Sequence, residues 1–193
     1  FELLIADQPS PEKAHDEGSK FWRWAKILDV GSSRFPAKRR LDADLSHPAM
    51  AVNLDACINC TLCVRACRDV QVNDVIGMAH RGADSKVVFD FDDPMGDSTC
   101  VACGECVQAC PTGALLPAAV TSPNGRVQPD RQVKSICPYC GVGCQLTYNI
   151  KNDKLLFVDG RDGPANRNRL CVKGRFGFDY VHHPDRLTYP LIR

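Results

Sequence analysis

Twelve cysteines are the residues of this chain best suited to chemistry, and they fall into three groups. The first two groups share the spacing C-x-x-C-x-x-C-x-x-x-C. Three thiolates at this spacing can wrap one face of an iron-sulfur cube, while the fourth cysteine points toward a second cube. The spacing therefore predicts two [4Fe-4S] clusters that exchange their fourth ligands. The first would be bound by Cys57, Cys60, Cys63 and Cys110, and the second by Cys67, Cys100, Cys103 and Cys106.

Two other uses of clustered cysteines fit this spacing less well. Disulfide frameworks scatter their cysteines through small secreted domains, whereas these lie only two or three residues apart. Four-cysteine zinc sites usually combine two C-x-x-C pairs and seldom use a run of three. Clustered thiolates need a reducing compartment, and no apolar run is long enough to span a bilayer. We therefore expect a cytoplasmic protein with no membrane span.

The third group of cysteines has a different spacing and predicts a different kind of site. It reads Cys137-Pro-Tyr-Cys140-Gly-Val-Gly-Cys144 and is completed by the distant Cys171. The two glycines let the backbone curl around a cluster with little steric penalty. This segment resembles the N-terminal cluster domain of the molybdenum or tungsten bis-pyranopterin oxidoreductases. Its form is most similar to formate dehydrogenases and assimilatory nitrate reductases, so we expect a third [4Fe-4S] cluster on these four cysteines.

The same resemblance covers about residues 131–193 and implies a role for Lys173. In that family a lysine two residues after the last cysteine lies between the cluster and the pterin, and Lys173 matches this position. The resemblance thus implies that Lys173 is an electron relay or an electrostatic partner. It also implies a molybdenum or tungsten bis-pyranopterin guanine dinucleotide, held by residues that follow Arg193.

The two-cluster region from Cys57 to Leu115 carries a second resemblance. It is similar to the module shared by NAD-linked formate dehydrogenase catalytic subunits, iron-only hydrogenases and the large iron-sulfur subunit of complex I. Together the resemblances imply the N-terminal iron-sulfur part of a formate dehydrogenase catalytic subunit. Formate would be oxidised to CO2 at the downstream metal centre, and electrons would pass to a flavin-containing, NAD-reducing diaphorase-type partner. A nitrate reductase, a complex I-type subunit and a stand-alone ferredoxin-like electron carrier remain alternatives.

On this interpretation the residues present carry electrons and none of them is catalytic. The chain begins at Phe1 without an initiator Met, so we expect it to be a piece of a longer protein. Relatives bind a further cluster upstream with one His and three Cys. Here no cysteine precedes Cys57, and Gln8-Pro9 stands where His-Pro is expected. We therefore expect that cluster to be absent.

Other functions find little support in the sequence. The formal net charge is +1, and no stretch combines aromatic and basic residues as nucleic-acid binding requires. We expect no nucleic-acid partner. Four histidines lack an acidic or cysteine constellation and are interpreted as structural or exposed. They are His15, His47, His80 and His182.

The expected fold class is α+β, with a ferredoxin-like two-cluster domain followed by a small [4Fe-4S] domain that contains a β-hairpin. The expected divisions are a helix and loop segment resembling a degenerate His/Cys cluster region at 1–49, the two-cluster domain at 50–120, a linker at 121–132 and the third-cluster domain at 133–193. The expected elements are helices at 19–30, 61–67 and 104–110, strands at 75–80 and 86–91, and hairpin strands at 145–150 and 155–159.

Details of two segments complete the prediction. In the first helix Ser19 should be the cap, Gly31 should lie at the end, and an apolar stripe should run along one face. That stripe consists of Phe21, Trp22, Ala25 and Leu28. The basic run at 38–40, inside a loop over 32–50, should be solvated.

Overall fold

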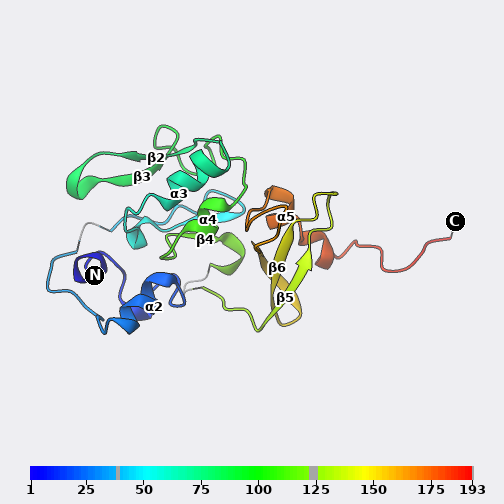
Figure 1. The fold of residues 1–193 in the computed structure, drawn as a ribbon, viewed down its shortest axis with the longest axis horizontal. Helices are drawn as coiled ribbons and strands as arrows, with labels where there is room; N and C mark the ends of the chain where they lie inside the picture. Colours follow the sequence, from blue (N-terminus) through cyan, green and yellow to red (C-terminus); the bar gives the residue numbers. More distant parts are fainter. Residues whose placement is uncertain (38–39, 122–125, 193) are drawn as a thin grey trace. The chain divides into compact units, whose positions relative to one another are not determined.

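The computed structural model describes residues 1–37, 40–121 and 126–192, and the chain forms two compact units (Figure 1). The first unit is Phe1–Gln128 and the second is Pro129–Arg193. Lys38 and Arg39 of the predicted basic run lie outside the described residues, as do 122–125 of the predicted linker. Within the described ranges, no helix has the length and apolar character needed to cross a membrane.

The N-terminal part of the first unit is helical. Its elements are α1 (Glu2–Ile5), the 3-10 turn η1 (Pro11–Lys13) and α2 (Lys20–Ile27). The Ser19 hydroxyl accepts a hydrogen bond from the Trp22 amide at 3.3 Å, so the predicted helix cap is confirmed. Ile5, Ala14, Phe21, Trp22 and Ala25 form a buried cluster, which we call the N-terminal core.

The end of α2 differs from the prediction. Leu28 is 50% exposed and does not join the apolar stripe. The left-handed residue after the helix is Asp29, with φ 53°, rather than Gly31. Aspartate tolerates this conformation better than most residues, so the helix ends at Ile27, earlier than the glycine suggested.

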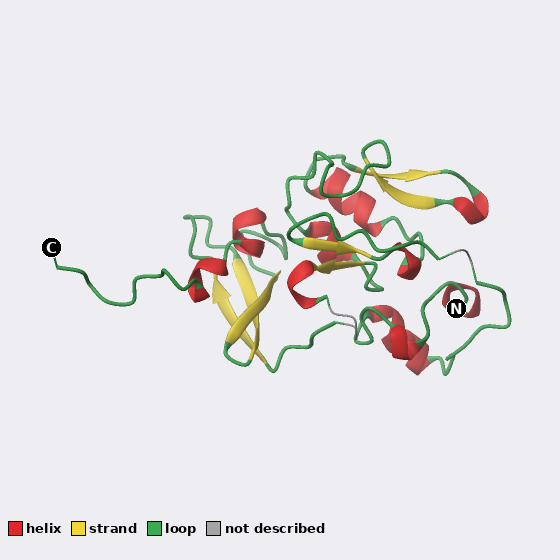
Figure 2. Cartoon of the chain, turned by 180° about the vertical axis from the view of Figure 1, so that it is seen from behind, coloured by secondary structure: helices red, strands yellow, loops and turns green. Residues whose placement is uncertain are grey.

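Two short strands tie the ends of the cysteine region together. Strand β1 (Met50–Val52) precedes the first cysteine repeat, and β4 (Leu115–Pro117) follows the second. They pair antiparallel, with Met50 opposite Pro117 and Val52 opposite Leu115, and every residue of both strands is buried. The 3-10 turns η2 (Leu54–Ala56) and η5 (Ala118–Val120) flank this pair. The pairing therefore brings the start of one repeat to the end of the other (Figure 2).

The helices within the repeats are short and pack against each other. They are α3 (Leu62–Arg65) and α4 (Glu105–Ala109). The chain continues from α3 into a π-helical segment, η3 (Ala66–Val70), so the expected single helix over 61–67 is wrong in its second half. A π turn is wider than an α turn and rotates the side chains that follow, and such turns are frequent at functional sites. Cys67 lies in this wide turn.

A hairpin separates the two repeats, and its two strands lie where strands were predicted. Strand β2 (Ile76–Ala79) pairs antiparallel with β3 (Lys86–Phe89), and the 3-10 turn η4 (Gly82–Asp84) connects them.

The second unit contains a three-stranded antiparallel sheet in the order β5-β6-β7. Its elements are β5 (Arg131–Ile136), β6 (Gln145–Lys151), β7 (Lys154–Gly160), the helix α5 (Val172–Phe176) and the 3-10 turn η6 (Asp179–His182). The predicted hairpin is β6-β7, and its turn residues Asn152 and Asp153 are left-handed, as a tight hairpin requires. Strand β5 was not predicted, and it begins inside the expected linker.

Candidate iron-sulfur sites

Four cysteines from both repeats line one small cavity of about 20 Å³ in the first unit. These are Cys57, Cys60, Cys63 and Cys110, the set predicted for the first cluster. Helix α3 carries Cys63 into the cavity, and Cys110 follows the end of α4. Apolar side chains such as Leu54, Ile58 and Leu115 complete the lining.

The other four cysteines of the repeats line a second cavity of about 10 Å³. These are Cys67, Cys100, Cys103 and Cys106. Val75 and Ile76, from the start of the hairpin, close one side of it. Each cavity thus receives three cysteines from one repeat and one from the other, which is the grouping that the spacing predicts.

Left-handed residues shape both loops in the same way. They are Asn59 and Thr61 in the first repeat, with φ 52° and 60°, and Ala102 and Gly104 in the second, with φ 55° and 72°. Each pair brackets the second cysteine of its repeat. Backbone that alternates between right- and left-handed conformations turns successive N–H groups into one concavity, as in many iron-sulfur sites. Such a concavity suits the inorganic sulfides of a cluster.

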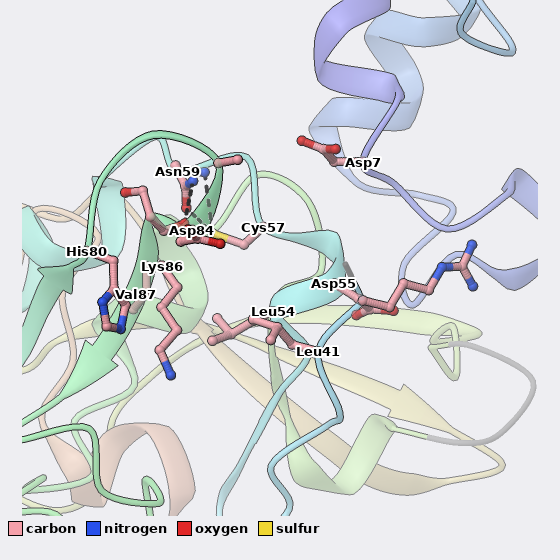
Figure 3. Close-up of a pocket in the computed structure, with 13 residues that line it drawn as sticks. Asp7, Leu41, Leu54, Asp55, Cys57, Asn59, His80, Asp84, Lys86 and Val87 are labelled. Atoms are coloured by element: carbon pink, nitrogen blue, oxygen red, sulfur yellow. Dashed lines mark hydrogen bonds between the residues drawn. The ribbon is translucent and has the colours of Figure 1, made fainter. Parts of the chain in front are cut away.

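Backbone amides also reach the thiols directly. The Asn59 N–H donates to Cys57 Sγ at 3.4 Å, and the Ala102 N–H donates to Cys100 Sγ at the same distance. Figure 3 shows Asn59 beside Cys57 at the edge of a neighbouring cavity of about 310 Å³. Amide hydrogen bonds to sulfur stabilise thiolates, so these loops favour the charged form that a metal requires.

Burial of the thiols acts in the opposite direction. It raises the pKa of Cys63 to about 12, with smaller contributions from the thiols of Cys57, Cys110 and Cys60. Burial likewise raises the pKa of Cys106 well above its ordinary value. Thiols that resist ionisation in the apolar cavity become thiolates when a cationic centre binds them and displaces the protons. The donor set therefore fits a metal-sulfide group.

The spacing of the cysteine side chains can be compared with the needs of a single ion and of a cube. Across the ranges that the structure describes, no three His, Cys, Asp or Glu side chains lie close enough to bind one metal ion. A zinc ion needs all its ligands around one point, whereas a [4Fe-4S] cube binds each thiolate through a different iron. All twelve thiols are free of disulfides. None of the cysteines is therefore withheld from a metal group by a disulfide bond.

The third group of cysteines gathers at one end of the β5-β6-β7 sheet. Strand β5 ends one residue before Cys137, and β6 begins one residue after Cys144, so the sheet fixes both ends of this loop. The Cys137 N–H donates to the Cys144 carbonyl at 2.8 Å. Burial raises the pKa of Cys144, and the nearby thiols of Cys137, Cys140 and Cys171 raise it further. The four predicted ligands thus lie close enough to interact.

A buried asparagine that the sequence did not point to holds Cys171 in place. The Asn166 side chain is buried, and its Oδ1 accepts from the Gln145 N–H at 2.9 Å. Its Nδ2 donates to the carbonyls of Gln145, Arg161 and Arg169 at 2.9, 3.2 and 3.0 Å. These bonds tie the segment before Cys171 to the start of β6. No pattern in the local sequence marks this asparagine.

Lys173 lies in α5, two residues after Cys171, with its side chain exposed. The neighbouring Gly174 faces the third site, since a Cβ there would lie 3.5 Å from Cys137 Sγ. Arg175 is buried, and its Nη1 donates to the Val158 carbonyl at 3.4 Å, which anchors α5 to β7. The helix therefore places Lys173 close to the third group of cysteines.

Among the described residues, no histidine lines the two cysteine cavities, but His80 and Cys57 both line the cavity of Figure 3, and the prediction for His15 needs a correction. His15 does have an acidic partner, because its Nε2 lies 2.8 Å from Asp55 Oδ1. His47 is buried, which lowers its pKa, and its Nδ1 accepts from the Ala49 N–H. His182 accepts from the Leu155 N–H at 3.1 Å, and His80 is exposed at the edge of the cavity in Figure 3.

Comparison with known proteins agrees with this geometry. The chain is 34% identical over 201 residues to an NADH-quinone oxidoreductase subunit of Rhizobium meliloti (strain 1021), a match covering 100% of this chain and 23% of the relative. It is 30% identical over 177 residues to "Putative formate dehydrogenase SH0748" of Staphylococcus haemolyticus (strain JCSC1435), covering 72% of this chain and 18% of the relative. The chain thus spans about a fifth of the length of these curated relatives.

A solved structure and two domain families complete the comparison. A crystal structure of an NAD+-reducing [NiFe]-hydrogenase in the H2-reduced state has a TM-score of 0.55 and 25% identity, covering 62% of this chain and 53% of the other. Residues 56–114 match the 4Fe-4S dicluster domain, and residues 130–183 match the molybdopterin oxidoreductase Fe4S4 domain. The chain therefore joins a 4Fe-4S dicluster domain to a molybdopterin oxidoreductase Fe4S4 domain.

Proposed function

We propose that this chain conducts electrons through three [4Fe-4S] clusters within a formate dehydrogenase catalytic subunit. The observation that carries the proposal is the grouping of twelve cysteines, none of them in a disulfide, into three sets of four, two of them drawn from both repeats. Each set would bind one cube, which supplies one-electron redox chemistry when bound. The reducing interior of a cell, where such thiols stay free, is the proposed location.

The chain's own residues have three tasks in this function. The thiolates bind the cubes, and the amides of Asn59 and Ala102 stabilise the charged sulfurs. Apolar residues such as Leu54 and Val75 exclude water from the cavities. Lys173 acts as an electrostatic relay between the third site and the pterin. No residue here makes or breaks a bond of the substrate.

The remaining parts of the reaction lie in the longer protein. A molybdenum or tungsten bis-pyranopterin guanine dinucleotide would oxidise formate to CO2, and electrons would leave toward a flavin-containing diaphorase-type subunit that reduces NAD. The similarity to "Putative formate dehydrogenase SH0748" and to an NAD+-reducing [NiFe]-hydrogenase supports this assignment.

The test uses the full-length protein purified without oxygen. Three cubes require about 12 iron atoms per chain, and formate should reduce all three clusters in the EPR spectrum. Iron near 8 or 16 atoms per chain would contradict the count of three.

A second candidate is electron transfer in an NADH-quinone oxidoreductase. The match to the Rhizobium meliloti relative over the whole chain favours it. In that case NADH, supplied with the partner subunits, reduces the clusters, and formate leaves them oxidised.

Lys173 has its own test. We expect Lys173→Ala to keep all three clusters but to slow formate-dependent reduction of the third one by about tenfold or more, which is an increase of about 1.4 kcal/mol in the barrier. Lys154→Ala, which removes an exposed lysine of β7, is the matched control. Full electron flux through Lys173→Ala would contradict the relay.

A further inference from the structure

We infer that Gln8 is a positioning residue for the first iron-sulfur site, and that through it the N-terminal segment tunes that site without affecting the second one. The inference rests on the proposed function of the two cavities as [4Fe-4S] sites. It concerns a segment in which no thiol lies, because the first cysteine is Cys57.

Gln8 is buried, with 6% of its surface exposed, and reaches the first repeat directly. Its Nε2 donates to the carbonyl of Ala56, the residue before Cys57, at 2.9 Å. Its Oε1 is buried and has no hydrogen-bond partner among the described residues. A half-satisfied buried amide costs free energy, and an apolar side chain of this size would avoid that cost. What Gln8 provides at this position, and an apolar side chain would not, is therefore its hydrogen bond to the Ala56 carbonyl.

The rest of the N-terminal segment contacts the same site from other directions. The Phe21 N–H donates to the carbonyl of Pro111, the residue after Cys110, at 2.9 Å. Ile58, the residue after Cys57, packs against the N-terminal core. The backbone is thus fixed beside the first and the last thiol of this cavity. Small movements of these thiols change the hydrogen bonds to sulfur that set a cluster's potential.

The second site has its own corresponding support. Asp90 accepts from the N–H of Thr99, the residue before Cys100, at 2.6 Å, and from its hydroxyl at 3.0 Å. Asp90 lies only nine positions before Thr99, at the end of the hairpin, whereas Gln8 lies 48 positions before Ala56. Each repeat therefore has one side chain that holds the residue before its first cysteine. The two side chains form a matched pair for experiment.

The experiment compares Gln8→Leu with Asp90→Asn in the full-length holoprotein. Reduction potentials of the individual clusters are measured by EPR-monitored titration, and cluster loss is followed with an iron chelator. Signals are assigned with Cys110→Ser and Cys67→Ser. We expect Gln8→Leu to shift the potential of the first cluster and to speed its loss several-fold, with the second cluster unchanged. Asp90→Asn should shift only the second cluster.

The possible results distinguish the role of Gln8 from the presence of the clusters. A wild-type protein without these clusters would contradict the proposed function itself. A wild-type protein with three clusters, and a Gln8→Leu variant whose potentials are all unchanged, would overturn the role of Gln8 alone. A lower unfolding temperature with unchanged potentials would overturn that role in the same way. If Gln8→Leu does not fold, the milder Gln8→Asn, which keeps the amide but shortens its reach, is judged by the same shift in potential.

Discussion

The two cysteine repeats share their spacing and loop conformation but differ in what holds them. The first repeat is supported by a segment distant in sequence, through Gln8 and the N-terminal core. The second is supported by the neighbouring hairpin through Asp90. The repeated spacing thus sets which thiols meet, while the surroundings decide how independently each site can fold.

The repeats also differ at one strained position. Thr61 and Gly104 occupy equivalent places after the second cysteine, and both are left-handed. Glycine adopts this conformation freely, whereas a β-branched residue does so at a cost. At this position the first repeat therefore carries backbone strain that the second avoids.

The largest expected effect tests the exchange of cysteines between the repeats. Because Cys110 lies in the first cavity and Cys67 in the second, Cys110→Ser should weaken or remove only the first cluster. Cys67→Ser should do the same only to the second. Iron content and EPR spectra of both variants measure this outcome. If each variant instead damaged the cluster bound by its own repeat, the exchange would be wrong.

A smaller effect tests the dependence of the first repeat on the N-terminal core. Phe21 is 4% exposed and stacks on Phe1, so Phe21→Ala should cost about 3–5 kcal/mol of unfolding free energy. The first cluster should be lost more readily while the second is retained. Phe157→Ala, at a buried position of the second unit, should cost a similar amount of unfolding free energy. It should not make the first cluster easier to lose than the second. Equal loss of both clusters in Phe21→Ala would remove the distinction between the repeats.

The smallest effect tests the strained position. Gly104→Thr should destabilise the protein by roughly 1–2 kcal/mol, since it places a β-branched residue in the left-handed region. Thr61→Gly should stabilise it by up to about 1 kcal/mol, because the relief of strain exceeds the entropy cost of glycine. Chemical denaturation of the holoproteins measures both changes. The two variants must change the unfolding free energy in opposite directions. A loss of stability in both would contradict the difference in strain.

Much of the site was predictable because cysteine spacing is a local property. The exchange of Cys67 and Cys110 between the cavities follows from the geometry of three thiolates around one cube and needs no tertiary information. The strands β2 and β3 and the β6-β7 hairpin followed from short apolar or alternating runs bounded by turn residues.

The features that were missed depend on contacts between distant residues. All but one of the residues of β5 are exposed, so no alternation of apolar and polar side chains marks it, and it exists because it pairs with β6. Gln8 and Asn166 act through bonds to residues 48 and 21 positions away. The π turn that holds Cys67 lies beside the packed helices α3 and α4 and has no sequence signal of its own.

The turn between β2 and β3 divides the first unit into two pieces that need each other. A chain cut near Gly82 would leave Cys57, Cys60, Cys63 and Cys67 on one fragment and the second repeat on the other. Each fragment would then hold three thiols for one cavity and a single thiol for the other. Neither could complete a site alone, so fusing the fragments to two interacting proteins would make cluster assembly a reporter of their association.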